Sequence, residues 1–280
     1  MDSYNVPILL IAFNRADKLK LVINRVREIR PIRIFVFVDG PRPNNVKDAD
    51  DIKLVKETII RYIDWPCEVK TLFQKKNLGC GFGPATAISW FFKEIEAGII
   101  LEDDCVPDKT FFTYVQELLV RYRDMERVML ISGSNHPGNI RPAQTSYYFS
   151  KYVLIWGWAS WRRAWKHFDH SLIPEADRSH VWDGAWKASV EKAYGLDILP
   201  RVNLVENIGF GIDATHTIRE TEDTTKHPMQ FPLTHPRKVS WDALSDYYTY
   251  RHYYGRNIIN AFLTVFRRYI GIKPKDTYEK

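Results

Sequence analysis

The chain has 280 residues, a formal net charge of +6, and nine tryptophans, fifteen tyrosines and fifteen phenylalanines. This length suits one large domain or two tightly fused halves with a substantial core, and no apolar stretch approaches the roughly 20 residues of a transmembrane helix. The basic residues are spread rather than gathered in blocks, which excludes an obvious nucleic-acid-binding tract and favours another anionic partner.

The cysteines and the N-terminus predict where the protein works. Cys67, Cys80 and Cys105 are odd in number and form no CxxC motif, which is typical of a reduced, cytoplasmic setting. The first residues, MDSYNVPILLIAFNR, lack a basic stretch and contain only a short apolar run. We therefore expect no signal peptide.

The first hundred residues alternate between buried runs and amphipathic segments. Strands are expected at Val6–Phe13, Arg33–Asp39, Cys67–Phe73 and Gly98–Leu101, and helices at Asp17–Ile29, Asp51–Ile63 and Phe82–Ala97. This alternation predicts βαβ units, and hence an α/β fold with a mostly parallel sheet flanked by helices. In such sheets ligands bind outside the carboxyl ends of the strands.

The second half follows a different pattern. A helix at Lys109–Tyr122 and a strand at Val128–Ser132 precede an aromatic region in which Trp158, Trp161 and Trp165 recur at helical spacing. We expect a single domain over 1–240, with a nucleotide-binding half at 1–107 and an aromatic-rich acceptor half at 108–240.

A C-terminal helical segment is expected at 241–280. Within it, RNIINAFLTVFRRYIGIKPK combines an apolar stripe with basic residues. Such a segment can lie on an anionic membrane surface, or dock on the domain as a terminal helix.

Three consecutive carboxylates, Glu102, Asp103 and Asp104, follow the predicted strand Gly98–Leu101. Adjacent like charges repel one another, and a hard divalent cation with oxygen ligands would relieve that repulsion. The triplet therefore predicts a Mn²⁺ or Mg²⁺ site. The alternative is a solvated turn or a cap for the helix that begins near Asp108.

The segment Asn77–Ala85 is glycine-rich and opens a helix, so its backbone N–H groups could approach a ribose or phosphate. It is not a dinucleotide-binding fingerprint, because Pro84 stands where the third glycine belongs. His216, in a glycine-bearing loop, is a further candidate metal ligand or a hydrogen-bonded loop residue. No GxSxG, GxxxxGK[ST] or HExxH motif occurs.

Several segments in this order resemble the GT-A nucleotide-sugar glycosyltransferases. They include VPILLIAFNR, VDGPR, IILEDDCVPDKTFF, VMLISGSNHPG, IWGWASWRRAWKHF, VWDGAW and LPRVNLVENIGFG. The chain looks most like the N-acetylglucosaminyltransferase I group, with its Glu-Asp-Asp (DxD-like) motif, and the bacterial HlpA-like sugar transferases. The similarity runs from about residue 6 to 217.

The resemblance implies roles for individual residues. Asp104 resembles the direct metal ligand, with Asp103 and His216 as further candidates, and Asp183 resembles a catalytic base. The sequence alone favours Asp183 as the N-cap of a helix at Gly184–Tyr194, and the resemblance favours the base instead. Trp158 and Trp182 are expected to line the acceptor and sugar site. The expected donor-binding residues are Phe13, Asn14, Arg15, Asp39, Asn77, Gly79, Glu102 and Asp103.

The expected function is a metal-dependent, inverting glycosyltransferase (hexosyltransferase) that uses a UDP-sugar, such as UDP-GlcNAc, and a glycan or lipid-linked glycan acceptor in bacterial surface polysaccharide synthesis. It would be cytoplasmic, with peripheral contact at the inner membrane through its C-terminal segment, and would not bind nucleic acid. Two alternatives remain open. One is a nucleotidyltransferase that makes the sugar nucleotide, and the other is a non-catalytic nucleotide- or sugar-binding module.

Overall fold

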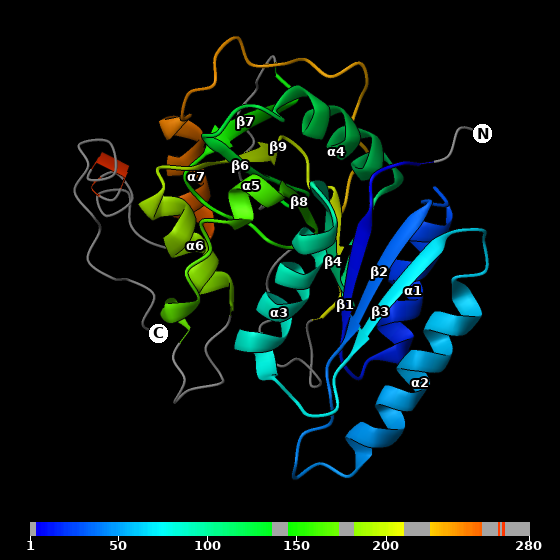
Figure 1. The fold of residues 1–280 in the computed structure, drawn as a ribbon. Helices are drawn as coiled ribbons and strands as arrows, with labels where there is room; N and C mark the ends of the chain where they lie inside the picture. Colours follow the sequence, from blue (N-terminus) through cyan, green and yellow to red (C-terminus); the bar gives the residue numbers. More distant parts are fainter. Residues whose placement is uncertain are drawn as a thin grey trace.

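An eight-stranded sheet, with helices on both faces, forms the centre of the computed structural model (Figure 1). The structure describes residues 4–135, 145–173, 182–209 and 225–253, together with 263, 265 and 266. The strand order is β3-β2-β1-β4-β8-β6-β9-β7. The predicted α/β fold with a mostly parallel sheet is confirmed.

The first half contains four parallel strands. They are β1 (Ile8–Ala12), β2 (Arg33–Val38), β3 (Glu68–Phe73) and β4 (Ala97–Glu102). Continuous runs such as ILLIA and RIFVFV form central strands because both of their faces are covered. All five residues of β1 are buried. Parallel pairing places the ends of β1, β2 and β4 at the same edge of the sheet.

Helices from the first half cover the two faces separately. They are α1 (Ala16–Arg27), α2 (Lys47–Tyr62) and α3 (Gly79–Glu94). One core joins α1 and α2 to Leu10 and Val36, and the other joins α3 to Leu9 and Phe35, as the alternation of side chains along a strand requires. Both α2 and α3 begin a few residues earlier than the sequence predicts.

The second half extends the same sheet with strands in both directions. Its elements include α4 (Lys109–Arg121), β6 (Val128–Ser132), β7 (Tyr147–Ser150), β8 (Trp158–Trp161), α5 (Arg162–Trp165), the short 3₁₀ helix His170–Leu172, α6 (Trp182–Lys192) and β9 (Leu196–Pro200). Strand β8 is antiparallel to both β4 and β6.

The helix suggested by the tryptophan spacing is wrong. Trp158 and Trp161 lie in β8, where all four residues are buried, and only Trp165 of the three lies in a helix. Their spacing also fits a fully buried strand followed by a turn of helix. The segment forms a strand because β8 pairs with β4 on one side and with β6 on the other.

A second, two-stranded ladder pairs β5 (Cys105–Pro107) with β10 (Val205–Asn207). It places Asn207 opposite Cys105, and the amide of Ile208 donates to the carbonyl oxygen of Asp104 at 2.9 Å. A segment of the second half thus lies against the carboxylate triplet.

Helix α7 (Ala243–Tyr253) packs against β7. The buried Asp246 accepts hydrogen bonds from Ser150 Oγ at 2.5 Å and from the Lys151 amide at 2.9 Å. Most of the predicted amphipathic segment after α7 lies outside the described residues. In the part of the chain that is described, no helix has the length and apolar character needed to cross a membrane.

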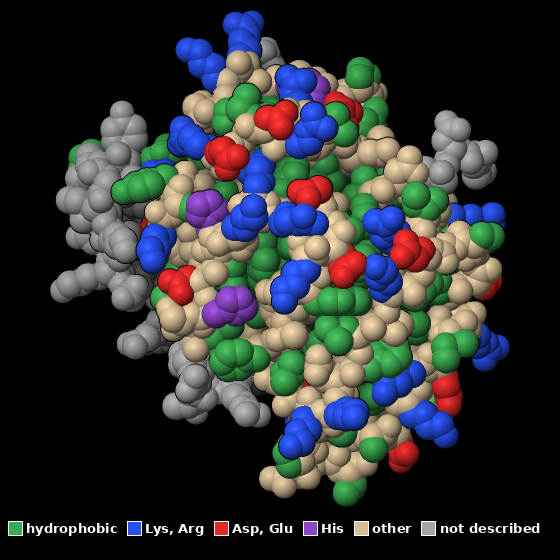
Figure 2. All heavy atoms as spheres, viewed as in Figure 1, with side chains coloured by type: hydrophobic (Ala, Val, Ile, Leu, Met, Phe, Trp, Pro, Cys, Tyr) green, Lys and Arg blue, Asp and Glu red, His purple; other side chains and the backbone are tan. Residues whose placement is uncertain are grey.

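Figure 2 shows one face of the molecule, on which basic and acidic side chains are interspersed. The net positive charge therefore does not produce a continuous basic surface on this face.

Candidate functional site

A pocket of about 370 Å³ lies at the carboxyl ends of β1, β2 and β4. Its lining includes all of the donor-binding residues expected from the sequence, together with Asp104, Trp182 and Asp183. The lining residues are Ile11, Ala12, Phe13, Asn14, Arg15, Phe37, Asp39, Arg42, Asn77, Gly79, Cys80, Pro84, Glu102, Asp103, Asp104, Ile155, Trp156, Trp182, Asp183, Asn207 and Gly209.

The positive partner of the carboxylate triplet in this structure is Arg15. Its Nη2 atom forms an ion pair with Asp104 Oδ2 at 2.8 Å and a second, shorter one with Asp103 Oδ1. The backbone amide of Phe13 donates to the other oxygen of Asp103 at 3.3 Å. The β1–α1 connection therefore supplies one guanidinium and one amide to two carboxylates at the end of β4.

Burial sets the electrostatics of this edge. The pKa of Glu102 is raised to about 8, chiefly by burial and then by the neighbouring charges of Asp104 and Asp103. Burial also raises the pKa of Asp103 to about 6, while the charge of Arg15 opposes that rise. One guanidinium thus compensates the triplet only in part.

Asp39, at the end of β2, binds the start of α3. Its carboxylate accepts hydrogen bonds from the amides of Gly40, Leu78 and Gly79 and from Asn77 Nδ2, at 2.8–3.2 Å. Two of the N–H groups that the sequence offers to a ribose or phosphate, those of Leu78 and Gly79, are therefore occupied by a carboxylate of the chain itself.

Arg42 is a second cation at the pocket that the sequence analysis missed. Its Nε and Nη2 atoms both contact the buried carboxylate of Asp48 at 2.7 Å, and its guanidinium stacks over the ring of Phe13. Asn14 Nδ2 also donates to Asp48, at 3.1 Å. The signal was the VDGPR turn after β2, whose arginine follows a strand end.

Asp183 lies in the first turn of α6 rather than capping it. One carboxylate oxygen forms an ion pair with Lys187 Nζ at 2.6 Å. The other is buried and has no hydrogen-bond partner among the described residues. The negative charge of Asp183 also contributes to raising the pKa of Glu102, so helix α6 faces the end of β4.

The structure separates the expected aromatic residues. Trp182 lines the pocket, whereas Trp158 is fully buried behind it, with the two rings stacked at 5.8 Å between centroids. Trp156, which the sequence did not single out for this role, also lines the pocket. Trp158 thus supports Trp182 and does not itself reach the cavity.

The triplet can be tested for its fit to a divalent cation. No group of three His, Cys, Asp or Glu side chains in the described ranges forms a complete metal site. Mg²⁺, however, is usually held by one or two carboxylates and by substrate phosphates, so Asp103 and Asp104 fit a cation that arrives with a nucleotide. His216 lies outside the described residues.

The wall beside Asp104 is formed by backbone. A Cβ atom at Gly209 would overlap Asp104 Oδ2 and would lie 2.9 Å from Asn207 Oδ1. Only glycine permits this approach, because any side chain at this position would overlap the carboxylate.

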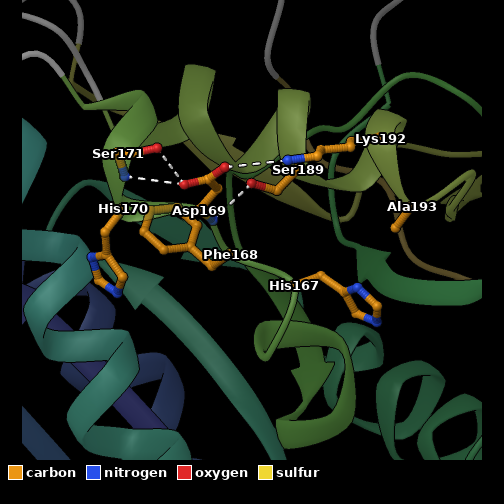
Figure 3. Close-up of a pocket in the computed structure, with 8 residues that line it drawn as sticks. All are labelled: His167, Phe168, Asp169, His170, Ser171, Ser189, Lys192 and Ala193. Carbon is orange, nitrogen blue, oxygen red and sulfur yellow. Dashed lines mark hydrogen bonds and ion pairs between the residues drawn. The ribbon is translucent and has the colours of Figure 1, made fainter.

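A larger hollow of about 650 Å³ lies along α6, away from the strand ends (Figure 3). Its polar groups bind one another: Asp169 accepts from the amide and hydroxyl of Ser171, and forms an ion pair with Lys192. The rings of His167 and His170 lie apart. We therefore take the pocket at the strand ends as the candidate functional site.

The sheet and the helices on its two faces define a Rossmann-like α/β fold. No protein-family model matches the chain, and the comparison with curated proteins gives no match. A cytidylyltransferase from Leptospira borgpetersenii is similar in structure, with 10% identity, a TM-score of 0.43, and coverage of 99% of this chain and 100% of that one.

Two further solved structures are similar over a smaller part of the chain. UDP-glucose pyrophosphorylase has 9% identity and a TM-score of 0.43, and the match covers 69% of this chain and 89% of that one. The inositol-1-phosphate CTP transferase of T. maritima has 8% identity and a TM-score of 0.39, and the match covers 70% and 85%.

These comparisons correct the expected reaction type. The similar structures are nucleotidyltransferases, so the expectation of a glycosyltransferase of the hexosyltransferase type is wrong. At these identities and TM-scores they define no substrate for this chain. We therefore derive the function from the side chains of the pocket.

Proposed function

We propose that this protein is a sugar-nucleotide nucleotidyltransferase that binds its nucleotide and a divalent cation in the pocket at the ends of β1, β2 and β4. The observation that carries the proposal is that two cations, Arg15 and Arg42, and the carboxylates of Asp103 and Asp104 line one open cavity. The arginines can bind phosphate groups, and the carboxylates can bind a metal ion that is itself bound to phosphates.

In the proposed reaction, a phosphate oxygen of a sugar 1-phosphate attacks the α-phosphorus of a nucleoside triphosphate. The new P–O bond forms as the bond from the α-phosphorus to the bridging oxygen breaks. Pyrophosphate leaves with that electron pair, and the sugar nucleotide is the other product. Catalysis of such a transfer consists mainly of positioning and of stabilising charge.

The residues divide this work by charge. Asp104 and Asp103 would hold the cation, which supplies Lewis-acid stabilisation of the charge that develops on the departing pyrophosphate. The guanidinium of Arg15 would bind phosphate oxygens. Arg42, which is held in place by Asp48, would add positive potential to the pocket and so favour the binding of the nucleotide.

Asp183 fits a role in binding the sugar. A phosphate nucleophile is already an anion, so it needs no general base, unlike a hydroxyl group. One oxygen of Asp183 is held by Lys187, and the Asp183 carboxylate lines the pocket, where it can accept a hydrogen bond from a sugar hydroxyl. Trp182 and Trp156 offer apolar ring surfaces beside it.

Two further expectations belong to this proposal. The nucleotide is a uridine nucleotide, and the sugar nucleotide serves surface glycan synthesis. Contact of the C-terminal basic segment with an anionic membrane stays a prediction.

Pyrophosphate release tests the reaction. The full chain is incubated with each nucleoside triphosphate, a sugar 1-phosphate and Mg²⁺ or Mn²⁺. We expect pyrophosphate only when nucleotide, sugar phosphate and metal are all present, and we expect uridine triphosphate to be the best donor. Release of UDP from a UDP-sugar, without any pyrophosphate from the forward mixture, would overturn the proposal.

A thermal-shift screen tests binding separately. We expect uridine nucleotides to raise the melting temperature only in the presence of the metal, because ligands that bind the folded state stabilise it. If no nucleotide raises the melting temperature with either metal, this pocket is not a nucleotide site.

A further inference from the structure

Arg15 occupies the position between the two carboxylates that would hold the cation. A single nitrogen, Nη2, contacts both Asp103 Oδ1 and Asp104 Oδ2. These are the oxygens that Asp103 and Asp104 present toward Arg15: Asp103 Oδ2 accepts from the Phe13 amide, and Asp104 Oδ1 lies 3.6 Å from Cys105 Sγ. The guanidinium is therefore bound to the oxygens that are best placed to be metal ligands.

The surroundings of Asp104 restrict access to its carboxylate. The backbone of Gly209 is so close that a Cβ atom there would overlap Asp104 Oδ2, the oxygen that Arg15 also contacts. Both residues are buried, Asp104 with 8% of its surface exposed and Asp103 with 2%. A cation bound by Asp103 Oδ1 and Asp104 Oδ2 together would need the place that Arg15 Nη2 holds.

Charge adds to this steric competition. A divalent ion next to a fixed guanidinium would place three positive charges within a few ångströms, in a partly buried site where charges are weakly screened. An incoming polyphosphate removes the conflict, because it offers the guanidinium a second anionic partner with matching geometry.

We infer that Arg15 is a placeholder for the divalent cation: it blocks the carboxylates in the free protein and moves to the nucleotide phosphates when the metal and nucleotide enter together. This inference rests on the proposed nucleotide site. It predicts that metal alone binds weakly and that metal and nucleotide bind with positive coupling.

Binding of Mn²⁺ alone tests the placeholder without any nucleotide. Free Mn²⁺ is measured by electron paramagnetic resonance against wild-type protein, Arg15→Gln and Arg42→Gln. We expect Arg15→Gln to bind Mn²⁺ at least about tenfold more tightly than wild type, a change of about 1.4 kcal/mol. Arg42→Gln removes a cation from the same pocket that pairs with Asp48 instead, and it should change the affinity much less.

Equal or weaker Mn²⁺ binding by Arg15→Gln would overturn the inference. So would an equal gain in Arg42→Gln, because the effect would then come from the general potential of the pocket. If Arg15→Gln does not fold, Arg15→Lys replaces it. Lysine keeps the positive charge but lacks the forked guanidinium, so we expect Arg15→Lys to bind Mn²⁺ more tightly than wild type, though less tightly than a protein with unblocked carboxylates. An unchanged affinity would count against the inference.

The melting temperature of wild-type protein separates this inference from the proposed function. We expect Mn²⁺ and uridine diphosphate together to raise it by more than the sum of their separate effects. If uridine diphosphate has no effect but Arg15→Gln still binds Mn²⁺ more tightly, Arg15 blocks the carboxylates, but its move to nucleotide phosphates fails together with the nucleotide proposal. If the two shifts merely add in wild-type protein, the placeholder fails while the nucleotide site stands.

Discussion

Single side chains decide the chemistry at the end of β4. Asp104 is the carboxylate that faces the pocket from between Arg15 and the backbone of Gly209, whereas Asp103 is tied to the β1–α1 connection through the Phe13 amide. Asp183 approaches from α6 with one oxygen that no described residue binds. Substitutions that remove the charge of one of these carboxylates should therefore distinguish metal binding from sugar binding.

Asp104→Asn should abolish metal dependence. The substitution keeps the shape of the side chain but removes the charge that a hard cation requires. We expect the metal-dependent thermal shift with nucleotide to disappear, and the catalytic efficiency of pyrophosphate release to fall about a hundredfold or more. Asp124→Asn, whose side chain is 87% exposed, is the control and should behave like wild type. Retained metal dependence in Asp104→Asn would place the cation elsewhere.

Asp183→Asn should affect the sugar substrate selectively. Loss of a charged acceptor for one hydroxyl weakens binding in the ground and transition states alike, so we expect KM for the sugar phosphate to rise about tenfold, with little change in turnover. KM for the nucleoside triphosphate should stay the same. If turnover instead slows by a factor of about 10²–10⁴ while KM is unchanged, Asp183 acts as a general base.

Helices and strands differ in how closely they pack against their neighbours in this fold. Strand β4 passes so close to α3 that Gly98 lies against the ring of Phe91 and the carbonyl oxygen of Pro7. Helix α6, by contrast, carries Gly184, where a Cβ atom would meet no described atom within 4 Å. These two glycines make a matched pair, because the same substitution should have opposite effects on stability.

Gly98→Ala should destabilise the protein by about 1–3 kcal/mol, because the methyl group forces apart a packed strand and helix. Gly184→Ala should leave stability unchanged or raise it by about 0.5 kcal/mol, because alanine loses less backbone freedom in a helix. Urea unfolding curves for both variants measure the difference. Equal effects would show that α3 does not press on β4 at this position.

At the scale of the whole molecule, buried polar groups hold the second half together. Asp197 on β9 is fully buried and accepts hydrogen bonds from Ser132 Oγ at 2.6 Å and from the Leu154 amide at 3.1 Å. Burial raises its pKa well above the usual value of 3.8. Its protonation therefore couples the global stability to pH.

Because the folded-state pKa of Asp197 is raised, the folded state binds a proton that the unfolded state has already released above about pH 4. The contribution of Asp197 to the free energy of unfolding thus falls as pH rises from about 4 toward the folded-state pKa. Asp197→Asn cannot titrate, so we expect its melting temperature relative to wild type to increase as the pH is raised through this range. The exposed Asp50→Asn is the control, and a constant difference for Asp197→Asn would contradict the prediction.

Local patterns were enough to predict much of this protein. Runs such as ILLIA and RIFVFV are typical of strands covered on both faces, so they indicated the parallel sheet and the edge at which ligands bind. The three carboxylates at the end of β4 pointed to that edge as well. The strands and the carboxylate triplet each depend on residues that are adjacent in the sequence, so they can be predicted from it.

Only the tertiary structure decided which groups meet. The contact of Arg15 with Asp103 and Asp104 joins the β1–α1 connection to the end of β4, and Gly209 reaches Asp104 through the pairing of β10 with β5. Trp158 and Trp161 have a spacing that suits a helix, yet they lie in strand β8, which pairs with both β4 and β6. Sequence determined the chemical groups available at the pocket, whereas long-range packing determined that a guanidinium lies between two of its carboxylates.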